Sequence, residues 1–565
     1  MPQPHGVTVQ RPVHAMKTGI VLFCAALAAG AGPVAASAAE TEADPPSVGD
    51  FLGPAALPVP EPLDLGELQW RLPRRVRREG NRIFASLAPG EEGEEARATA
   101  VLDPALFRGR ALHCLRFRIR AKGAGIAKPR VPYHGLKFML RIGDSGWNSA
   151  PNRIGDWGEE EISFSCEIPA SGVESATLYL GIERCAGSVE FDLSSLRVED
   201  VGEIQPPVDR DFRVSYPPAV RDAGPARGVM LAIDLEKISE DDFATLEKWG
   251  ANLARYQISK DWKKAGGWES NDDYDAYLDR ALDILEERVL PWAGKHGVRI
   301  VVDLHATPGA RTAAEENRIF HERRYAEHFV RVWRRIAGRF KGDRRIYGYD
   351  LVNEPMQKAP APYSYLAVQR AAALAIRSVD PDATIIVAAN GYGHPGGFRT
   401  LSPLRLDNVV YTTHCYAPTA FTMQGLRNGK REGLARWPDP EKGWDKEYLR
   451  KALEPVLEFS REHDARILVG EFSAITWAPG AENYIRDCIE VFEEYGWDWC
   501  YHAFREWDGW SVEKTWVDYD PATMRDRYEP SDDNPRKRAL LDGFRRNAAP
   551  RENVGTDDEL TKPGP

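Results

Sequence analysis

The sequence lacks an excess of basic residues. Its 565 residues include 74 Lys and Arg against 85 Asp and Glu, which gives a formal net charge of −11 at pH 7. A surface that binds nucleic-acid phosphates needs clustered positive charge, so this balance argues against nucleic acid as a partner. Uncharged polymers remain open as partners.

The sequence also lacks an apolar run that would span a membrane comfortably. The apolar stretch at residues 20–31 (IVLFCAALAAGA) is too short for a span, follows Met16-Lys17 and precedes the A-x-A site Ala36-Ser37-Ala38. This order is typical of an export signal. We expect residues 1–39 to be a signal peptide, with translation starting at Met1 or Met16, and the mature protein to be secreted or periplasmic.

Cysteine is scarce, and no metal-binding spacing is present. Six cysteines follow the signal segment, at positions 114, 166, 185, 415, 488 and 500, without a C-x-x-C pair or a histidine cluster at zinc-finger spacing. We expect no metal site from this spacing, and we expect no cofactor. The sequence does not fix which cysteines pair in an exported protein.

What is present divides into two patterns. Short alternating apolar runs separated by Gly, Pro, Asn and Asp predict an antiparallel β-sandwich, jelly-roll-like. Farther on, eight apolar runs alternate with amphipathic helices, such as the one at 272–297, and predict an α/β domain, a (β/α)8 TIM barrel. An open doubly wound sheet is the alternative, but no Gly-rich loop follows the first strand. The expected parts are the signal at 1–39, a linker at 40–62, the sandwich at 63–203, a linker at 204–226, the barrel at 227–548 and a disordered tail at 549–565.

Polar side chains gather at the ends of the predicted barrel strands, where the function of such a barrel resides. Each of them alone could be a paired core residue. Six or more together favour a functional site, because burying so many polar groups costs stability. In chain order they are Arg255, His305, Asn353, Glu354, His414, Tyr416, Glu471 and His502.

Two glutamates, Glu354 on the fourth strand and Glu471 on the seventh, should face each other across the barrel mouth. Glycoside cleavage needs such a pair. One carboxylic acid donates a proton to the leaving oxygen while the other, ionised, attacks the anomeric carbon. Retention of configuration requires carboxyl groups about 5–5.5 Å apart, whereas inversion leaves room for a water.

Several motifs together resemble glycoside hydrolase family 5, over about residues 227–547. They are LVNEP, VGEFS, NLARYQIS, DLHATPG and HCY. The resemblance implies that Glu354 is the acid/base and Glu471 the nucleophile. It further implies that Asn353 holds the sugar 2-hydroxyl, that Arg255 and Tyr416 keep Glu471 ionised and oriented, and that His305 and His414 line the subsite beside the scissile bond.

The eighth strand departs from the family pattern. The family commonly has a tryptophan there as the floor of the −1 subsite, whereas this sequence has His502. Trp507, in the following loop, is a candidate for the missing stacking surface, although a tryptophan in such a loop also serves simple packing. The departure bears on the substrate and not on the reaction.

These observations predict a retaining β-glycosidase, endoglucanase-like, acting on a β-linked polysaccharide or oligosaccharide, either β-glucan or β-mannan, as a monomer. An exo-acting β-glucosidase or β-1,3-glucanase of the same family is an alternative. The sandwich resembles a carbohydrate-binding module, and binding and purely structural roles both remain open for it.

Two functions of other classes are alternatives. A metal-dependent barrel hydrolase could use His305, His414 and His502 as ligands, but the first strand lacks the H-x-H that such barrels usually carry. A catalytically silent sugar-binding protein would have no need to keep both glutamates.

Overall fold

The computed structural model describes residues 48–547, apart from 56, 130–132, 144–145, 205–210, 260–270, 427–428, 430, 521–522 and 524. The predicted signal peptide and the predicted tail lie outside the described residues, and so do parts of both predicted linkers. No described helix is both long and apolar enough to cross a membrane.

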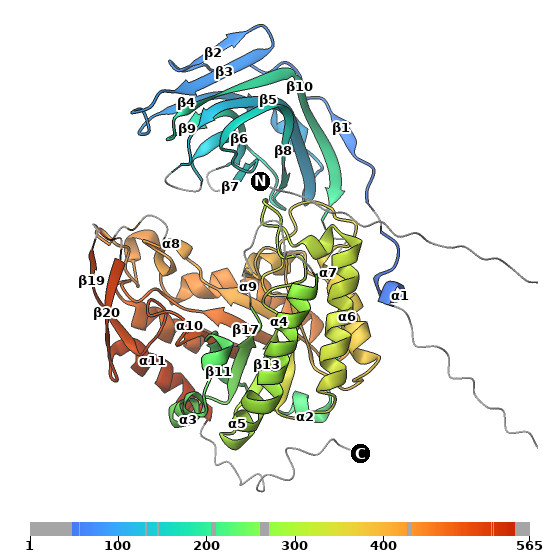
Figure 1. The fold of residues 1–565 in the computed structure, drawn as a ribbon, viewed down its shortest axis with the longest axis vertical. Coiled ribbons are helices and arrows are strands. Elements are labelled where there is room, and N and C mark those ends of the chain that lie inside the picture. Colours follow the sequence, from blue (N-terminus) through green and yellow to red (C-terminus); the bar gives the residue numbers. More distant parts are fainter. Residues whose placement is uncertain are drawn as a thin grey trace, which may run out of the picture. The chain divides into compact units, whose positions relative to one another are not determined.

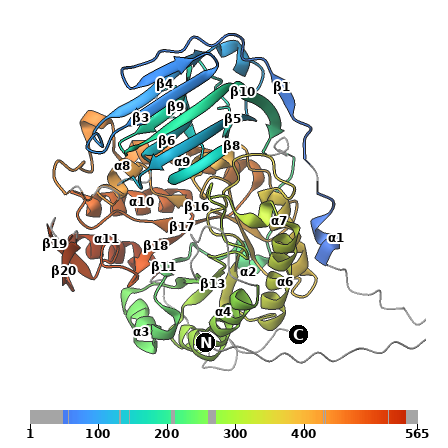
Figure 2. The ribbon, with the colours of Figure 1, turned by 45° about the horizontal axis from the view of Figure 1, so that its top comes forward.

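Two antiparallel sheets form the N-terminal sandwich, which confirms the predicted fold of this region (Figure 2). The first sheet has the order β2 (Val76–Glu79), β3 (Arg82–Leu87), β10 (Gly187–Glu203), β5 (His113–Ile126) and β8 (Gly155–Glu167), with β1 (Glu61–Leu63) also paired to β10. The second has the order β4 (Glu95–Leu102), β9 (Ala176–Glu183), β6 (Gly135–Ile142) and β7 (Gly146–Ser149).

Alternating burial along the strands builds the core of the sandwich. In β4 every second residue is buried, from Ala96 to Leu102, as expected for a strand with one face on a core. Phenylalanines from both sheets meet in that core, where the rings of Phe138 and Phe164 are 4.8 Å apart in an edge-to-face arrangement. The apolar periodicity of two therefore specifies which faces pack together.

Eight parallel strands close into a barrel, as predicted. Nearly all of their residues are buried, because helices cover the outside of the barrel and side chains fill the inside. The strands are β11 (Arg227–Leu231), β12 (Leu253–Gln257), β13 (Arg299–Asp303), β14 (Ile346–Asp350), β15 (Ile385–Ala388), β16 (Val409–Cys415), β17 (Ile467–Phe472) and β18 (Asp498–Phe504).

Amphipathic helices surround the strands, and Figure 1 shows α4, α6 and α7 on the outer surface of the barrel. The helix predicted over 272–297 is observed as α4, a π-helical stretch (Leu285–Val289) and α5. The longer helices are α3 (Glu240–Trp249), α4 (Asn271–Ile284), α5 (Leu290–Lys295), α6 (Arg323–Arg339), α7 (Tyr365–Arg377), α9 (Lys446–His463), α10 (Ala481–Tyr495) and α11 (Pro535–Phe544); short ones are α1 (Val48–Leu52), α2 (Pro218–Arg221) and α8 (Thr419–Thr422).

A β-hairpin follows the last barrel strand and was not expected from the sequence. Its strands are β19 (Lys514–Asp520) and β20 (Arg525–Pro530), and the hairpin lies beside α11 in both views (Figures 1 and 2). Asp526 accepts hydrogen bonds from the Trp516 indole at 2.9 Å and from the Arg431 guanidinium at 2.6 and 2.8 Å. The hairpin is thereby fixed to the loop that follows β16.

Candidate active site

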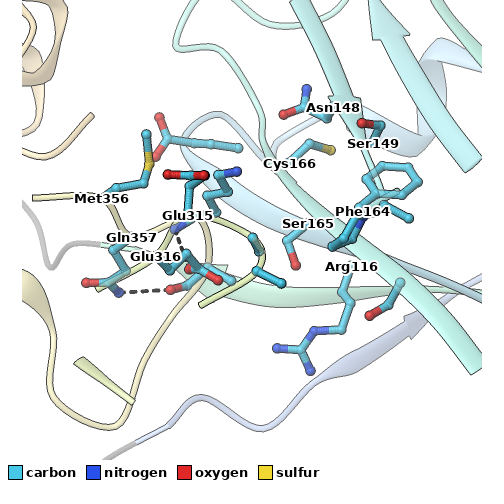
Figure 3. A pocket seen from close by; sticks show the side chains of 18 of the residues that line it. Arg116, Asn148, Ser149, Phe164, Ser165, Cys166, Glu315, Glu316, Met356 and Gln357 are labelled. Atoms are coloured by element: carbon cyan, nitrogen blue, oxygen red, sulfur yellow. Dashed lines mark hydrogen bonds between the residues drawn. The ribbon is translucent and has the colours of Figure 1, made fainter. Parts of the chain in front are cut away.

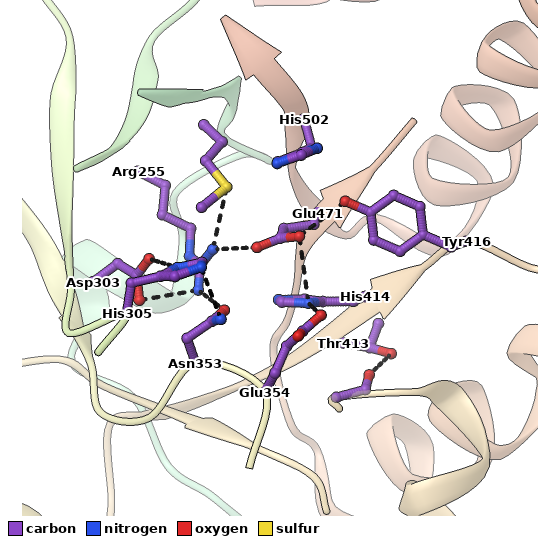
Figure 4. Close-up of polar contacts among 12 residues, drawn as sticks. Arg255, Asp303, His305, Asn353, Glu354, Thr413, His414, Tyr416, Glu471 and His502 are labelled. Atoms are coloured by element: carbon purple, nitrogen blue, oxygen red, sulfur yellow. Dashed lines mark hydrogen bonds and ion pairs between the residues drawn. The ribbon is translucent and has the colours of Figure 1, made fainter. Parts of the chain in front are cut away.

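The predicted site residues do come together at the C-terminal ends of the barrel strands (Figure 4). Parallel strands that close into a barrel all deliver their last residues to one rim, so residues far apart in sequence become neighbours. The set comprises Arg255 on β12, His305 after β13, Asn353 and Glu354 after β14, His414 on β16, Tyr416 after it, Glu471 on β17 and His502 on β18.

Arg255 is fully buried and holds the centre of this arrangement. Its Nη1 donates to Glu471 Oε1 at 2.9 Å, its Nη2 to Asn353 Oδ1 at 3.0 Å and its Nε to Asp350 Oδ2 at 2.9 Å. Nη2 also lies 3.1 Å from Asp303 Oδ1. A planar guanidinium with five donors suits such a fork of acceptors, and it fixes the direction of the Glu471 carboxylate.

Glu471 is held as a carboxylate by the charges around it. Its other oxygen accepts a hydrogen bond of 2.9 Å from the Tyr416 hydroxyl. Burial by itself raises the pKa of Glu471, but the positive charges of His414, His502 and Arg255 outweigh it and hold that pKa well below its ordinary value. An ionised and oriented carboxylate is what a nucleophile at this position requires.

The packing beside Glu471 explains the glycine in VGEFS. A Cβ at Gly470 would lie 2.7 Å from Thr412 Oγ1 and 3.2 Å from His414 Nε2. A larger residue would therefore clash with Thr412 and press on His414, whose Nδ1 is 3.7 Å from Glu471 Oε2. Burial lowers the pKa of His414, but the negative charges of Glu471 and Glu354 raise it by more than burial lowers it. The pKa of His414 therefore lies above its ordinary value.

Glu354 has a strained backbone that its surroundings stabilise. Its φ of 49° is in the left-handed region, which costs free energy for a residue with a Cβ and is common at functional sites. The Arg311 guanidinium donates to the Glu354 carbonyl at 2.7 Å, and the Glu354 carboxylate lies 3.2 Å from His414 Nδ1. These contacts aim the side chain into the barrel mouth.

The two glutamates point toward each other. One carboxylate oxygen of Glu354, one of Glu471 and a ring nitrogen of His414 all lie within 4.8 Å of one another. Among the described residues this is the group that could hold a metal ion, and it differs from the three histidines of the metal hypothesis. The same separation is short enough for both carboxylates to act on one glycosidic bond.

A chain of hydrogen bonds joins Asn353, His305 and Asp303. The Asn353 amide nitrogen is 3.0 Å from His305 Nε2, and His305 Nδ1 is 2.8 Å from Asp303 Oδ2. Since the Asn353 oxygen already accepts from Arg255, its nitrogen is the donor to Nε2, and the His305 proton resides on Nδ1. This chain fixes the orientation of both side chains.

His502 lies in the site, and Trp507 lies farther out. His502 Nε2 is 3.0 Å from Glu506 Oε2, and its ring contacts Tyr416 and Trp510 at centroid distances of 6.2 and 5.6 Å. Burial lowers the pKa of His502, but Glu506 and Glu471 raise it by more, so the pKa lies above its ordinary value. Trp507, 39% exposed, is 6.0 Å from Trp510, so the aromatic surface continues outward from His502.

A sequence model described as cellulase (glycosyl hydrolase family 5) matches residues 226–508, half of the chain. The chain belongs to glycosyl hydrolase family 5. It is therefore a glycoside hydrolase, and its substrate is a carbohydrate. The matched segment contains every predicted site residue, from Arg255 to Trp507.

Similar proteins include other glycosidases. The chain is 27% identical over 256 residues to endoglucanase C of Acetivibrio thermocellus, covering 40% of this chain and 74% of that protein. It is 22% identical over 273 residues to cellodextrinase A of Ruminococcus flavefaciens, covering 46% and 76%. The solved structure of endoglucanase Cel5A from Thermotoga maritima matches 56% of this chain and 96% of its own at 21% identity, with a TM-score of 0.42.

Three carboxylates that pair with the predicted site residues were not predicted from the sequence. Asp303 and Asp350 pair with Arg255, and Glu506 pairs with His502. Burial raises the pKa of Asp350 to about 6 although Arg255 lowers it. The sequence does contain a signal for Asp303 and Asp350. Each is an aspartate inside an otherwise apolar strand (VVDLH, YGYDLV), and such an aspartate needs a buried cation as its partner.

Proposed function

We propose that the protein is a secreted, retaining β-glycosidase that hydrolyses a β-linked polysaccharide, β-glucan or β-mannan, by double displacement. The observation that carries the proposal is the pair Glu354 and Glu471: one carboxylate oxygen of each lies within 4.8 Å of the other, and surrounding cations keep Glu471 ionised. This separation fits the spacing of about 5–5.5 Å in retaining enzymes better than the 6.5–9.5 Å of inverting ones.

In the first step, Glu471 attacks the anomeric carbon and the glycosidic bond breaks. Glu354 gives its proton to the departing oxygen, so the leaving sugar is released as an alcohol. In the second step, Glu354 takes a proton from water, the water oxygen attacks the anomeric carbon, and Glu471 departs as a carboxylate. The two inversions together retain the configuration.

The other residues support these two steps. Arg255 and Tyr416 hydrogen-bond the two oxygens of Glu471 and hold the attacking one in place. Asn353, held by Arg255 and His305, is placed to bind the sugar 2-hydroxyl, where hydrogen bonds strengthen in the transition state. The −1 subsite and its outer edge are lined by His305, His414, His502 and Trp507.

The β-glucan assignment takes its support from the relatives named as an endoglucanase and a cellodextrinase. Export takes its support from the apolar segment at 20–31 and the A-x-A site that follows it. Reducing-sugar release from cellulose, lichenan, laminarin, xyloglucan and mannan would identify the polymer.

Azide rescue tests the roles of the two glutamates. Glu471→Ala should lose turnover, and azide should restore it with an α-glycosyl azide as product, because azide takes the vacated position of the nucleophile. Glu354→Ala should spare substrates with good leaving groups and give a β-glycosyl azide, because here azide attacks the glycosyl-enzyme. If Glu471→Ala gives no α-azide while it remains folded, Glu471 is not the nucleophile.

A further inference from the structure

A cavity of about 860 Å³ lies between sandwich strands and two loops of the barrel (Figure 3). Its lining comes from β5 to β8 of the sandwich and from residues 313–316 and 356–360, which follow β13 and β14. The volume is within the range of about 300–1,000 Å³ of ligand-binding pockets. Neither the family assignment nor the chemistry above accounts for it.

Buried contacts border this cavity. The Cys114 thiol of β5 donates to the Lys358 carbonyl at 2.7 Å. Around it, a small buried apolar cluster joins the sandwich to the loop after β14 and consists of Cys114, Val201, Ile204 and Ala359. The sandwich thus packs directly on the loop that begins at the catalytic strand end.

The same loop carries Glu354. Met356, which lines the cavity, follows Glu354 by two residues, and its amide donates to Asn317 Oδ1 at 2.8 Å. Arg311, from the loop after β13, holds the Glu354 carbonyl. A general acid protonates the oxygen of the leaving sugar, so the leaving-group part of a polymer lies on the Glu354 side of the scissile bond. The cavity adjoins the same loop, because Met356 and the residues after it line the cavity.

The lining has the chemistry that carbohydrate requires. Tyr133 and Trp147 line the cavity and are 59% and 51% exposed, which is unusual for such large rings. The Arg141 guanidinium lies 5.0 Å from the Trp147 ring and restrains it. Asn148, Ser165 and Arg116 also line the cavity and supply hydrogen-bonding groups (Figure 3). Exposed ring faces suit the C–H faces of sugars, and the polar groups suit their hydroxyls.

We propose that this cavity is a binding subsite for the leaving-group side of the glycan, built jointly by the sandwich and the barrel. The inference rests on the proposed function and extends it. The sandwich is then part of the substrate cleft rather than a separate module, and longer chains bind better because they reach Trp147 and Tyr133.

Chain-length dependence tests the subsite. Two values of kcat/KM are measured, one for a hexasaccharide and one for the matching aryl β-disaccharide, and the first is divided by the second. The hexasaccharide is cellohexaose or mannohexaose, whichever the wild type cleaves faster. Trp147→Ala should lower this ratio about tenfold, the size expected for losing one stacking ring, and Tyr133→Ala should lower it in the same direction.

The matched control is Val101→Ala, an apolar residue on β4 that is 72% exposed and does not line the cavity. It should keep the wild-type ratio. A wild-type ratio in Trp147→Ala and in Tyr133→Ala, with unchanged thermal unfolding, would overturn the subsite while leaving the proposed function intact. A wild-type enzyme that cleaves neither hexasaccharide nor aryl disaccharide would overturn the proposed function itself.

Discussion

At the scale of single residues, the site depends on unequal surroundings for two chemically identical side chains. Glu471 hydrogen-bonds to Arg255 and Tyr416, and nearby cations lower its pKa. The Glu354 carboxylate instead lies against His414 and is partly exposed at the barrel mouth. Two carboxyl groups in such different environments can perform opposite tasks in one reaction.

The pH dependence should reveal the role of His414. In His414→Gln the positive charge beside Glu471 is lost, so the pKa of Glu471 rises toward its ordinary value and less of the nucleophile is ionised in acid. The acid limb of the pH profile of kcat/KM should therefore move to higher pH.

The control for this measurement is His296→Gln, at the end of α5, where the histidine pairs with Glu247. Its acid limb should coincide with that of the wild type. An unmoved acid limb in His414→Gln would mean that His414 does not tune Glu471.

At the scale of elements, one arginine connects four strands of the barrel. Arg255 on β12 contacts Asp303 on β13, Asp350 on β14 and Glu471 on β17. These residues come from separate strands, so the register of the strands has to place the carboxylates next to the guanidinium. The network therefore ties the barrel strands together as well as orienting the candidate site.

Arg255→Met should lower the free energy of unfolding by about 3–5 kcal/mol, because it leaves buried carboxylates without their cation. Urea denaturation followed by circular dichroism measures it. Arg527→Met is the matched control: Arg527 pairs with Asp518 at 2.8 Å on the surface of the hairpin and should leave stability nearly unchanged. Equal losses in the two variants would contradict the structural role.

The barrel strands were predictable because each is a buried apolar run between helices, and the polar residues that end those runs indicated the site. The hairpin β19–β20 was not predictable in the same way, since sequences such as KTWVDYD and RDRYEP are charged and pair through the backbone. The pairing of His502 with Glu506 depends on how the loop after β18 turns, which a sequence pattern does not encode.

At the scale of the whole molecule, the chain joins a family 5 barrel, matched over 226–508, to a sandwich outside that match. The family segment supplies the carboxylates and the residues that orient them. The sandwich supplies Tyr133 and Trp147 at the cavity beside the loop of Glu354. Reaction and chain-length preference would thus come from different parts of one protein.

The central claim is that Glu354 and Glu471 act on one sugar by two successive displacements. Proton NMR of the first product released from a β-linked oligosaccharide tests it most directly, because the anomers have separate H1 signals before mutarotation mixes them. The account predicts that the β-anomer appears first and the α-anomer grows in later. An α-anomer that appears first would mean a single inverting displacement and would contradict the account.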